Sequence, residues 1–212
     1  MDVAQLTGGG SPTLGEALPI EFGNTVYAVR GRPNDGLRTI EHLAAWLRDM
    51  RPRLAITLTD ADLGSIGDDD LRQARELRDT IRTLAAAAVE GTAFDADAVA
   101  ALNRHTARAP RWPELRATPE PHLVTATSGR PVEAALAALA EEAAALFAGS
   151  TGLEVCACHG PGCVLFFVRD SPRREWCSAG CGNRARVARH YAKTRTMHKP
   201  GPKAEPPASG SS

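Results

Sequence analysis

The stretch Cys156–Arg184, CACHGPGCVLFFVRDSPRREWCSAGCGNR, contains all five cysteines of the 212-residue chain. Two cysteine pairs within it are closely spaced, with four residues between Cys158 and Cys163 and three between Cys177 and Cys181. Each short loop can present two thiolates to one side of a metal ion, and the glycines permit tight turns. Four thiolates favour zinc over the harder ions. The stretch therefore predicts one structural Zn²⁺ ion bound by these four cysteines.

Other interpretations of the cysteines remain open. Unpaired cysteines are common in protein cores, and four thiolates can also hold an iron–sulfur cluster. Cys156 could replace Cys158 as a ligand, because the two side chains share one face of an extended segment. The glycine-rich loop that follows favours Cys158, and we expect His159 to be exposed rather than a ligand. An odd number of cysteines without an export signal argues against a disulfide framework.

The residues around the cysteines predict a small, ordered fold. Val164–Val168 is apolar and predicts a strand, Asp170–Pro172 predicts a turn, and Arg173–Trp176 predicts the returning strand. The second cysteine pair then begins a helix that is expected to run to about Arg195. Knuckle, hairpin and helix in this order form a treble-clef-like arrangement. A segment this short buries little apolar surface, so zinc binding would supply folding free energy.

The formal charge of the chain divides unevenly along its length. The total is zero, with 25 basic and 25 acidic residues. Residues 154–212 carry ten Lys and Arg against four acidic residues, a net of +6, which leaves −6 on residues 1–153. Such an asymmetry indicates a nucleic-acid- or membrane-binding segment joined to a different region.

The region before the cysteines predicts a helical domain over residues 14–150. Apolar residues recur at helical spacing after Asn34-Asp35, after Asp68–Asp70 and after Asp95, each of which we expect to begin a helix, and again over Val132–Ala148. His122–Thr127 predicts a strand after a proline-rich loop, and Gly149–Gly152 predicts a hinge. The expected fold is mainly α with a few short strands. Residues 1–13 and 197–212 have the composition of disordered segments.

Several of these residues resemble a known bacterial family. The Cys158–Cys163 knuckle followed by Trp176–Arg184 (WCSAGCGNR) is similar to the CGNR zinc finger, named for the motif at Cys181–Arg184. The resemblance covers residues 153–196 and implies the same four zinc ligands and a DNA-binding role in transcription regulation. Residues 14–150 resemble the ABATE domain that precedes this finger, through LPIEFGNT at Leu18–Thr25, the helix ending at Trp46-Leu47, and ARELR at Ala74–Arg78. That resemblance implies a stress- or ligand-sensing region. Gly23 departs from the family, where a bulkier apolar residue is usual.

The helix after the last cysteine carries the candidate DNA contacts. Its cations are Arg184, Arg186, Arg189, Lys193 and Arg195. At 100° per residue, Arg186, Arg189 and Lys193 share one face and Val187 and Tyr191 another. We expect the apolar pair to pack on the hairpin, against Phe166 or Trp176, leaving the cationic face for phosphates or base edges. The alternative is a solvated face whose charge offsets that of the zinc thiolates. Asn183 is a candidate either for a base contact or for stabilising the turn.

The leading prediction is a two-part cytoplasmic regulator that binds DNA, with an unidentified small-molecule effector and a homodimer as further expectations. The alternative is a zinc-stabilised module that binds RNA or protein. An enzyme is not expected, because four cysteines close the zinc site and no nucleophile–base or phosphate-loop motif occurs. No apolar run is long enough to span a membrane. The effector-binding residues are unknown; Asn24, Arg38, Trp46 and Arg78 are candidates, with caps and surface positions as the alternative.

Overall fold

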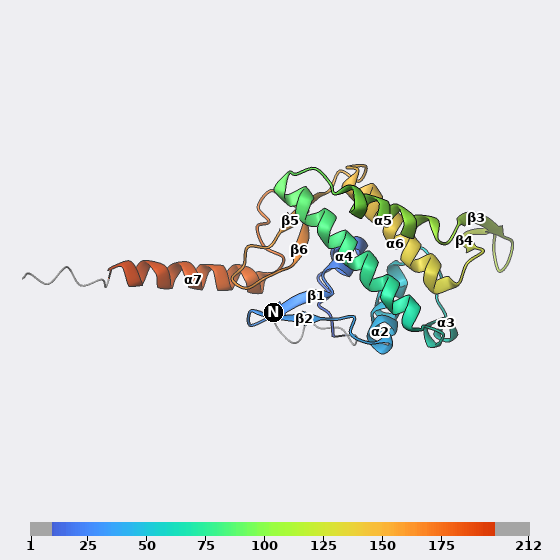
Figure 1. Cartoon of the computed structure of the whole chain (residues 1–212), viewed down its shortest axis with the longest axis horizontal. Helices are drawn as coiled ribbons and strands as arrows, with labels where there is room; N and C mark the ends of the chain where they lie inside the picture. The colour runs from blue at the N-terminus through green and yellow to red at the C-terminus, as the bar shows by residue number, and fades with distance from the viewer. Residues whose placement is uncertain (1–9, 198–212) are drawn as a thin grey trace, which may run out of the picture.

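A computed structural model describes residues 10–197 of the chain, with side chains up to residue 194. It shows a helical body from which one long helix projects (Figure 1). The two segments predicted to be disordered, 1–13 and 197–212, lie mostly outside the described residues. Within the part that is described, Ser11 and Pro12 are buried against the body.

The helices of the body surround one aliphatic core. They are α1 (Leu18–Gly23), α2 (Ile40–Met50), the 3₁₀ turn η2 (Arg51–Arg53), α3 (Asp60–Gly64), α4 (Asp68–Glu90), α5 (Ala96–Ala107) and α6 (Pro131–Phe147). Helices α4, α5 and α6 pack side by side, and α1 lies against both α4 and α6. Trp46 of α2 and Phe22 of α1 are the two largest fully buried side chains, with their ring centroids 4.8 Å apart. We call this set of packed residues the helical core.

Local sequence signals explain where most of these helices begin and end. Helix α4 begins with three aspartates, whose charge suits the helix N-terminus, and ends at Gly91 in the left-handed conformation, with φ +65°. Asp95 caps α5 by accepting a hydrogen bond from the backbone N–H of Ala98. Helix α6 buries ten residues, most of them alanines that let neighbouring helices approach closely.

One predicted helix start is wrong. Asn34 and Asp35 lie in strand β2 (Arg32–Asp35), and α2 begins after Thr39, whose side chain accepts the N–H of His42. Asp35 instead accepts the N–H of Leu37 and pairs with the buried Arg78. The sequence contains two residue types suited to a cap within six positions, and strand pairing selects the second.

Within residues 10–197, three antiparallel two-stranded sheets accompany the helices. They are β1 (Val26–Val29) with β2, β3 (Arg111–Arg116) with β4 (His122–Thr127), and β5 (Glu154–Ala157) with β6 (Phe166–Arg169). Helices predominate, as predicted, and the sheets are small. Strand β4 has the predicted bounds, but its partner β3 lies where a proline-rich loop was expected. Pro113 is compatible with β3 because the strand is at an edge, where its missing N–H leaves no bond unmade.

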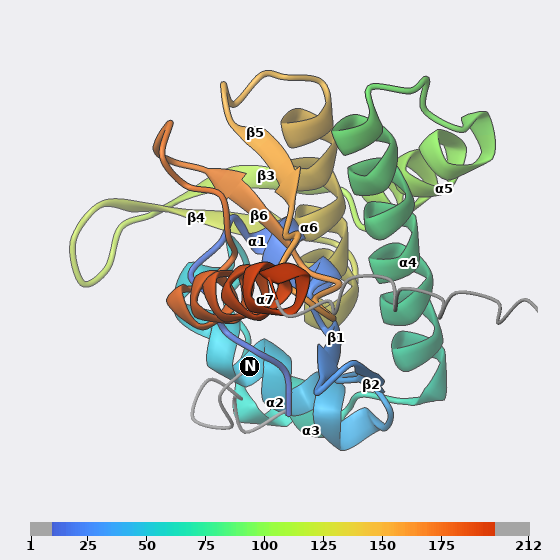
Figure 2. The same ribbon diagram turned by 90° about the vertical axis from the view of Figure 1, so that its left-hand side faces the viewer.

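The last helix, α7 (Ala179–Met197), leaves the body after its first turns. Figure 2, turned toward this end, shows α7 in front of the helical body. Cys181, Gly182 and Ala185 are buried at its base, whereas every residue from Arg186 to Thr194 is exposed. In the described residues, no helix has the length and hydropathy needed to cross a membrane.

Candidate metal centre and its attachment to the helical region

The structure brings Cys158, Cys163, Cys177 and Cys181 together. Their sulfur atoms all lie within 4.8 Å of one another, and Cys163 is the most exposed of the four. The Sγ atom of Cys177 is 3.8 Å from that of Cys163 and 3.4 Å from that of Cys181. A tetrahedral zinc ion with Zn–S bonds of about 2.3 Å requires sulfurs about 3.8 Å apart. The donor set and its spacing therefore fit a zinc ion.

The first cysteine pair is held by the turn of a hairpin. Cys158 follows β5 directly, and its N–H donates to the carbonyl of Leu165, 2.9 Å away. The N–H of Cys163 donates to the carbonyl of Gly160 at 2.8 Å, which closes the knuckle. A Cβ atom at Gly160 would come within 2.9 Å of the Cβ of Cys181. A side chain larger than hydrogen at Gly160 would thus push the two halves of the site apart.

The hairpin differs from its prediction. Strand β6 is shorter than Val164–Val168, and it pairs with β5, on the other side of the knuckle, rather than with Arg173–Trp176, which forms no strand. Cys156 pairs with Phe167 in this sheet and is not part of the sulfur cluster, which selects Cys158 as the ligand. Burial raises the pKa of the Cys156 thiol. His159 is exposed, as expected.

The second cysteine pair lies at the start of α7, with Cys177 two residues before the helix and Cys181 in its first turn. The backbone N–H of Cys177 points at the sulfur of Cys158, 3.4 Å away, and the N–H of Cys181 donates to the Ser178 hydroxyl. Arg184 donates from Nη2 to the sulfur of Cys181 at 2.8 Å. Donors of this kind stabilise thiolate charge, as outer-shell groups do in metal sites.

The thiols lie close enough for the protonation of one to affect its neighbours. Hydrogen bonding with Cys163, and then with Cys177, lowers the pKa of Cys158 to about 6. The same contact with Cys158 raises the pKa of Cys163 above its ordinary value. Because metal ligands bind as thiolates, a divalent cation among the sulfurs releases the protons that these groups share.

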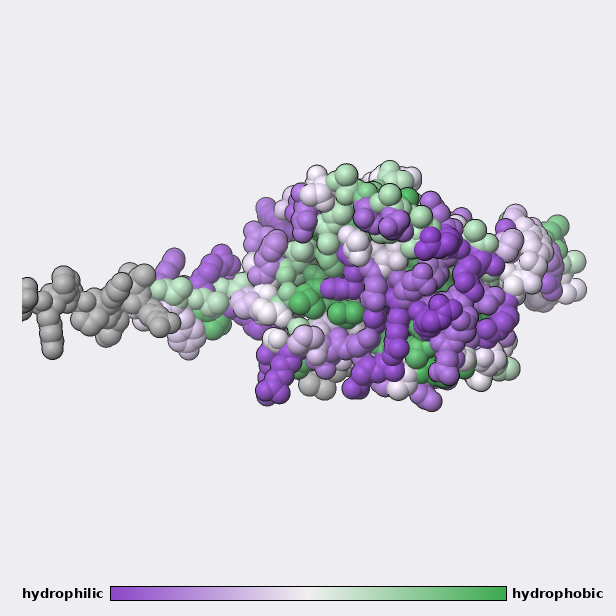
Figure 3. All heavy atoms as spheres, in the orientation of Figure 1, coloured by the Kyte–Doolittle hydropathy of each residue, from purple (hydrophilic) through white to green (hydrophobic). Residues whose placement is uncertain are grey.

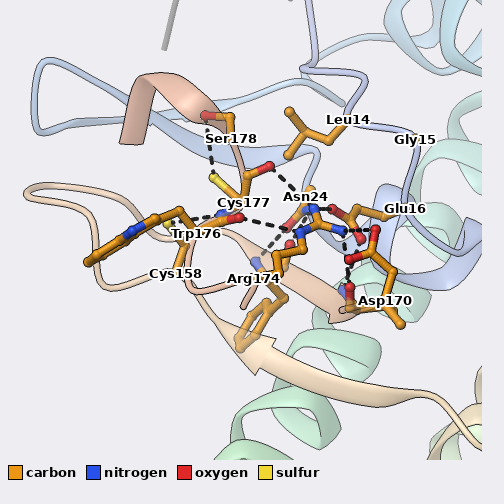
Figure 4. A network of polar contacts seen from close by, with 12 residues as sticks. Leu14, Gly15, Glu16, Asn24, Cys158, Asp170, Arg174, Trp176, Cys177 and Ser178 are labelled. Atoms are coloured by element: carbon orange, nitrogen blue, oxygen red, sulfur yellow. Dashed lines mark hydrogen bonds and ion pairs between the residues drawn. The ribbon is translucent and has the colours of Figure 1, made fainter. Parts of the chain in front are cut away.

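Arg174 and Glu16 join this centre to the helical region (Figure 4). The Glu16 side chain is 1% exposed, forms an ion pair with Arg174 and accepts the N–H of Val168 at 2.9 Å. Arg174 also donates to the carbonyl oxygens of Val168 and Cys177, and its guanidinium lies 4.9 Å from the ring centroid of Phe167. One buried ion pair thus connects the segment before α1, strand β6 and a zinc ligand.

Asn24 extends the same attachment along β6. Its side chain donates from Nδ2 to the carbonyl of Phe166 and accepts the N–H of Phe166, both at 2.9 Å. The amide therefore occupies the edge of β6 as a neighbouring strand would. Arg82 of α4 adds a hydrogen bond to the carbonyl of Val164 and stacks over the Phe166 ring at 5.3 Å.

Comparison with known families agrees with this organisation. Residues 16–150 match the family ABATE, described as "Putative stress-induced transcription regulator". The chain belongs to the ABATE family. Residues 155–194 match the CGNR zinc finger. Together with the sulfur cluster, this match identifies a structural zinc site in the chain. No curated protein sequence matches the chain.

The candidate DNA contacts of the CGNR finger lie at different places on α7. Arg184 is half-buried at the base, on the sulfur of Cys181. Arg186 and Arg189 are exposed; Arg186 donates to Asn183 and Arg189 to the carbonyl of Ala185. Lys193 is exposed as well. The side chain of Arg195 lies outside the described residues.

The apolar side of α7 is not packed as predicted. Val187 is 53% exposed and Tyr191 69% exposed, and neither contacts the hairpin core. The prediction is wrong because β5 and β6 pack on the ABATE region instead, where Val168 meets Ile20, Ala85 and Leu146. Over its described side chains, α7 consequently contacts the body through its first turns, since Arg186 to Thr194 are exposed.

The residues that attach the finger to the ABATE region were not predicted from the sequence. Glu16 and Arg174 are 158 residues apart, and neither lies in a motif. Three of the candidate effector residues make contacts within the protein: Asn24 binds β6, Trp46 is in the helical core and Arg78 pairs with Asp35. Arg38 is exposed.

Proposed function

We propose that the chain is a zinc-dependent regulator of transcription that binds DNA through α7. The projection of α7 from the body is the observation that carries this proposal. The helix contains five Lys and Arg and no acidic residue, and the part beyond its base is exposed. Figure 3 shows hydrophilic and hydrophobic residues side by side along it.

The dimensions of α7 suit a DNA groove. Its 19 residues span about 28 Å at 1.5 Å per residue. The major groove, about 12 Å wide, admits a single helix of this kind. Arg186, Arg189 and Lys193 face one side and would neutralise phosphates, while Val187 on the adjacent side can contact thymine methyl groups.

Zinc has a structural role in this proposal. Four thiolates fill a tetrahedral ion, so no coordination position is left for a water molecule or a substrate. The ion would fix the first turn of α7 relative to β5 and β6, and Arg184 would stabilise the charge on Cys181. We therefore propose a regulator rather than an enzyme.

A ligand response is supported by a cavity between the ABATE region and the finger. The cavity has a volume of about 430 Å³, and its walls include Ala88 and Val89 of α4, Phe167 of β6, and Trp176. This volume is within the usual range for small-molecule sites. The Trp176 ring also lies against Gly182, in the first turn of α7. A ligand in the cavity would touch both α4 and the support of α7.

The exposed pair Val187 and Tyr191 favours a second candidate function. An exposed aromatic ring can stack on an unpaired RNA base, and an apolar pair one helical turn apart can enter a groove of a protein partner. The two functions differ in their preferred ligand, because a helix that reads a major groove prefers duplex DNA to single-stranded RNA.

Fluorescence anisotropy with a labelled mixed-sequence DNA duplex tests the proposal on the full chain. We expect affinity to fall steeply between about 50 and 200 mM salt, since phosphate contacts release counterions. Arg189→Ala should weaken binding several-fold and lower the salt slope by about one. Arg104→Ala, which removes an exposed arginine of α5, is the matched control.

Three results would contradict the proposal. These are no binding to duplex DNA, tighter binding to single-stranded RNA of equal length, or an affinity that does not change with salt.

A further inference from the structure

The β1–β2 hairpin turns through two residues in the left-handed conformation. Val29 pairs with Arg32, and the turn residues Arg30 and Gly31 have φ values of +52° and +77°. This is the backbone of a type I′ turn, in which Asn-Gly is the preferred pair. Arg30 is the single non-glycine residue with positive φ in the described part of the chain. Residues held in such conformations cluster at binding sites.

The same turn lies against the zinc knuckle. A Cβ atom at Gly162 would come within 3.2 Å of the Cα of Gly31, so the two backbones are in contact. Tyr27 and Val29 of β1 pack in the same cluster as the cysteines. The ABATE hairpin is thus fixed beside the base of α7, as Figure 1 shows.

A small cationic cavity lies between the turn and the finger. It has a volume of about 120 Å³ and is lined by Ala28, Arg30, Gly31, Pro161, Gly162 and Arg184. This is far below the size of a site for a drug-like molecule. Two of the six residues are arginines and two are glycines, which allow a ligand to approach the backbone closely.

The arginines of the turn are not neutralised by the protein. Arg30 and Arg32 are exposed, and neither takes part in an ion pair with the side chains described between residues 10 and 194. Arg184 uses Nη2 for the sulfur of Cys181, which leaves further N–H groups on its guanidinium. Guanidinium groups that line one cavity without a carboxylate form a site for an oxyanion such as a phosphate.

We propose that this turn is a second DNA-binding element, contributed by the ABATE region. One phosphodiester group of the duplex backbone binds between Arg30 and Arg184, and Arg32 contacts a neighbouring phosphate. This inference rests on the proposed DNA binding by α7 and extends it: the finger and the helical region form one continuous surface, and the turn sets the orientation of α7 on the duplex.

The test replaces Arg30 with asparagine in the full chain. Arg30→Asn removes the charge and installs a residue that prefers the turn conformation, so thermal stability should rise by about 2–4 °C. Affinity for a mixed-sequence duplex should nevertheless fall about three- to tenfold, with a salt slope lower by about one. Arg32→Ala should weaken binding to a similar extent. Arg108→Ala, an exposed arginine between α5 and β3, should leave affinity within about twofold.

The outcomes separate this inference from the proposed function. If Arg189→Ala weakens binding but Arg30→Asn and Arg32→Ala do not, α7 binds DNA alone and the second element is excluded. If the unmodified chain binds no DNA, both proposals are wrong. A loss of affinity equal to that of Arg108→Ala would indicate only an effect of net charge and would also exclude the site.

Discussion

The helical core and the finger core are stabilised in different ways. The helical core is built from aliphatic residues of six helices around Trp46 and Phe22. The finger core consists of four cysteine ligands, Cys156 and a few apolar residues, of which Phe167 and Leu165 are the most buried. Tyr27, a residue of the ABATE region, belongs to the finger core as well. The comparison teaches that apolar burial stabilises the helical region, whereas metal coordination and contacts with ABATE residues stabilise the finger.

Replacing a zinc ligand should have the largest effect and should act on the finger alone. Structural zinc binding supplies about 10–16 kcal/mol in small finger domains. We expect Cys177→Ser to reduce zinc content from about one ion per chain to near zero. Hydrogen exchange should then show lost protection over β5, β6 and the base of α7, with α4 and α6 still protected.

Cys156→Ser is the control for this experiment. Cys156 lies in β5, the strand that leads into the knuckle, but it is not part of the sulfur cluster. The variant should therefore retain its zinc. Loss of protection in α4 and α6 after Cys177→Ser would contradict the separation of the two cores.

Replacing the central residue of the helical core should destabilise the helical region. Trp46→Ala removes a fully buried side chain, at an expected cost of about 3–5 kcal/mol in the free energy of unfolding. Urea denaturation followed by circular dichroism measures this change. Trp112→Ala, at a 45% exposed position, should cost no more than about 0.5 kcal/mol. Equal costs for the two variants would overturn the assignment of the core.

Removing Arg174 from the junction between the two cores should make the free energy of unfolding depend more strongly on pH. Arg174→Met leaves Glu16 buried without a cation, at an expected cost of about 3 kcal/mol near neutral pH. Burial already raises the pKa of Glu16, against the opposing effects of Val168 and Arg174. A carboxyl group with a raised pKa favours the folded state below its unfolded value and loses that contribution as pH rises through the folded pKa.

The cost of Arg174→Met should therefore be smaller at pH 5 than at pH 8, as chemical denaturation at the two values would show. Arg173→Met changes an exposed neighbour and should show no such dependence. A cost that is the same at both pH values would mean that Glu16 is not the group left unpaired.

The smallest effect is expected from His105 in α5. Its ring is buried with neither nitrogen hydrogen-bonded to the described residues, and burial lowers its pKa. A base with a lowered pKa stabilises the fold above its unfolded pKa, about 6.5, and that contribution is lost as pH falls toward the folded value. His105→Phe should therefore flatten the loss of stability just below pH 6.5, by at most about 1.4 kcal/mol per pH unit. The control is His122→Phe, at an exposed position. If His105→Phe loses stability below pH 6.5 as steeply as the unmodified chain, His105 is not the group responsible.

Local signals in the sequence were sufficient for much of the fold. The aspartates before α4, Gly91 after it and Asp95 before α5 each act within one helical turn, and these helices were predicted correctly. The knuckle at Cys158 and Cys163 could be predicted because it, too, is local. In contrast, β3 contains Pro113, so its identity depends on pairing with β4, which no local pattern encodes.

Contacts between distant residues account for what could not be predicted. Asn24 was a candidate effector-binding residue, with a cap or surface position as the alternative, yet it binds Phe166, 142 positions away. The β5–β6 hairpin packs on α1 and α4 rather than under α7, and this choice depends on the assembled helical region. The position of Arg30 beside the knuckle depends on the same assembly.

The amide of Asn24 on the edge of β6 limits how far the finger can be transplanted. A chimera that carried only residues 153–196 to a new host protein would leave the N–H and the carbonyl of Phe166 without these partners, and would expose Val168. Any functional graft would have to carry Glu16, Asn24 and their scaffold with it. The finger and the helical region should accordingly be inherited, exchanged and engineered as one unit.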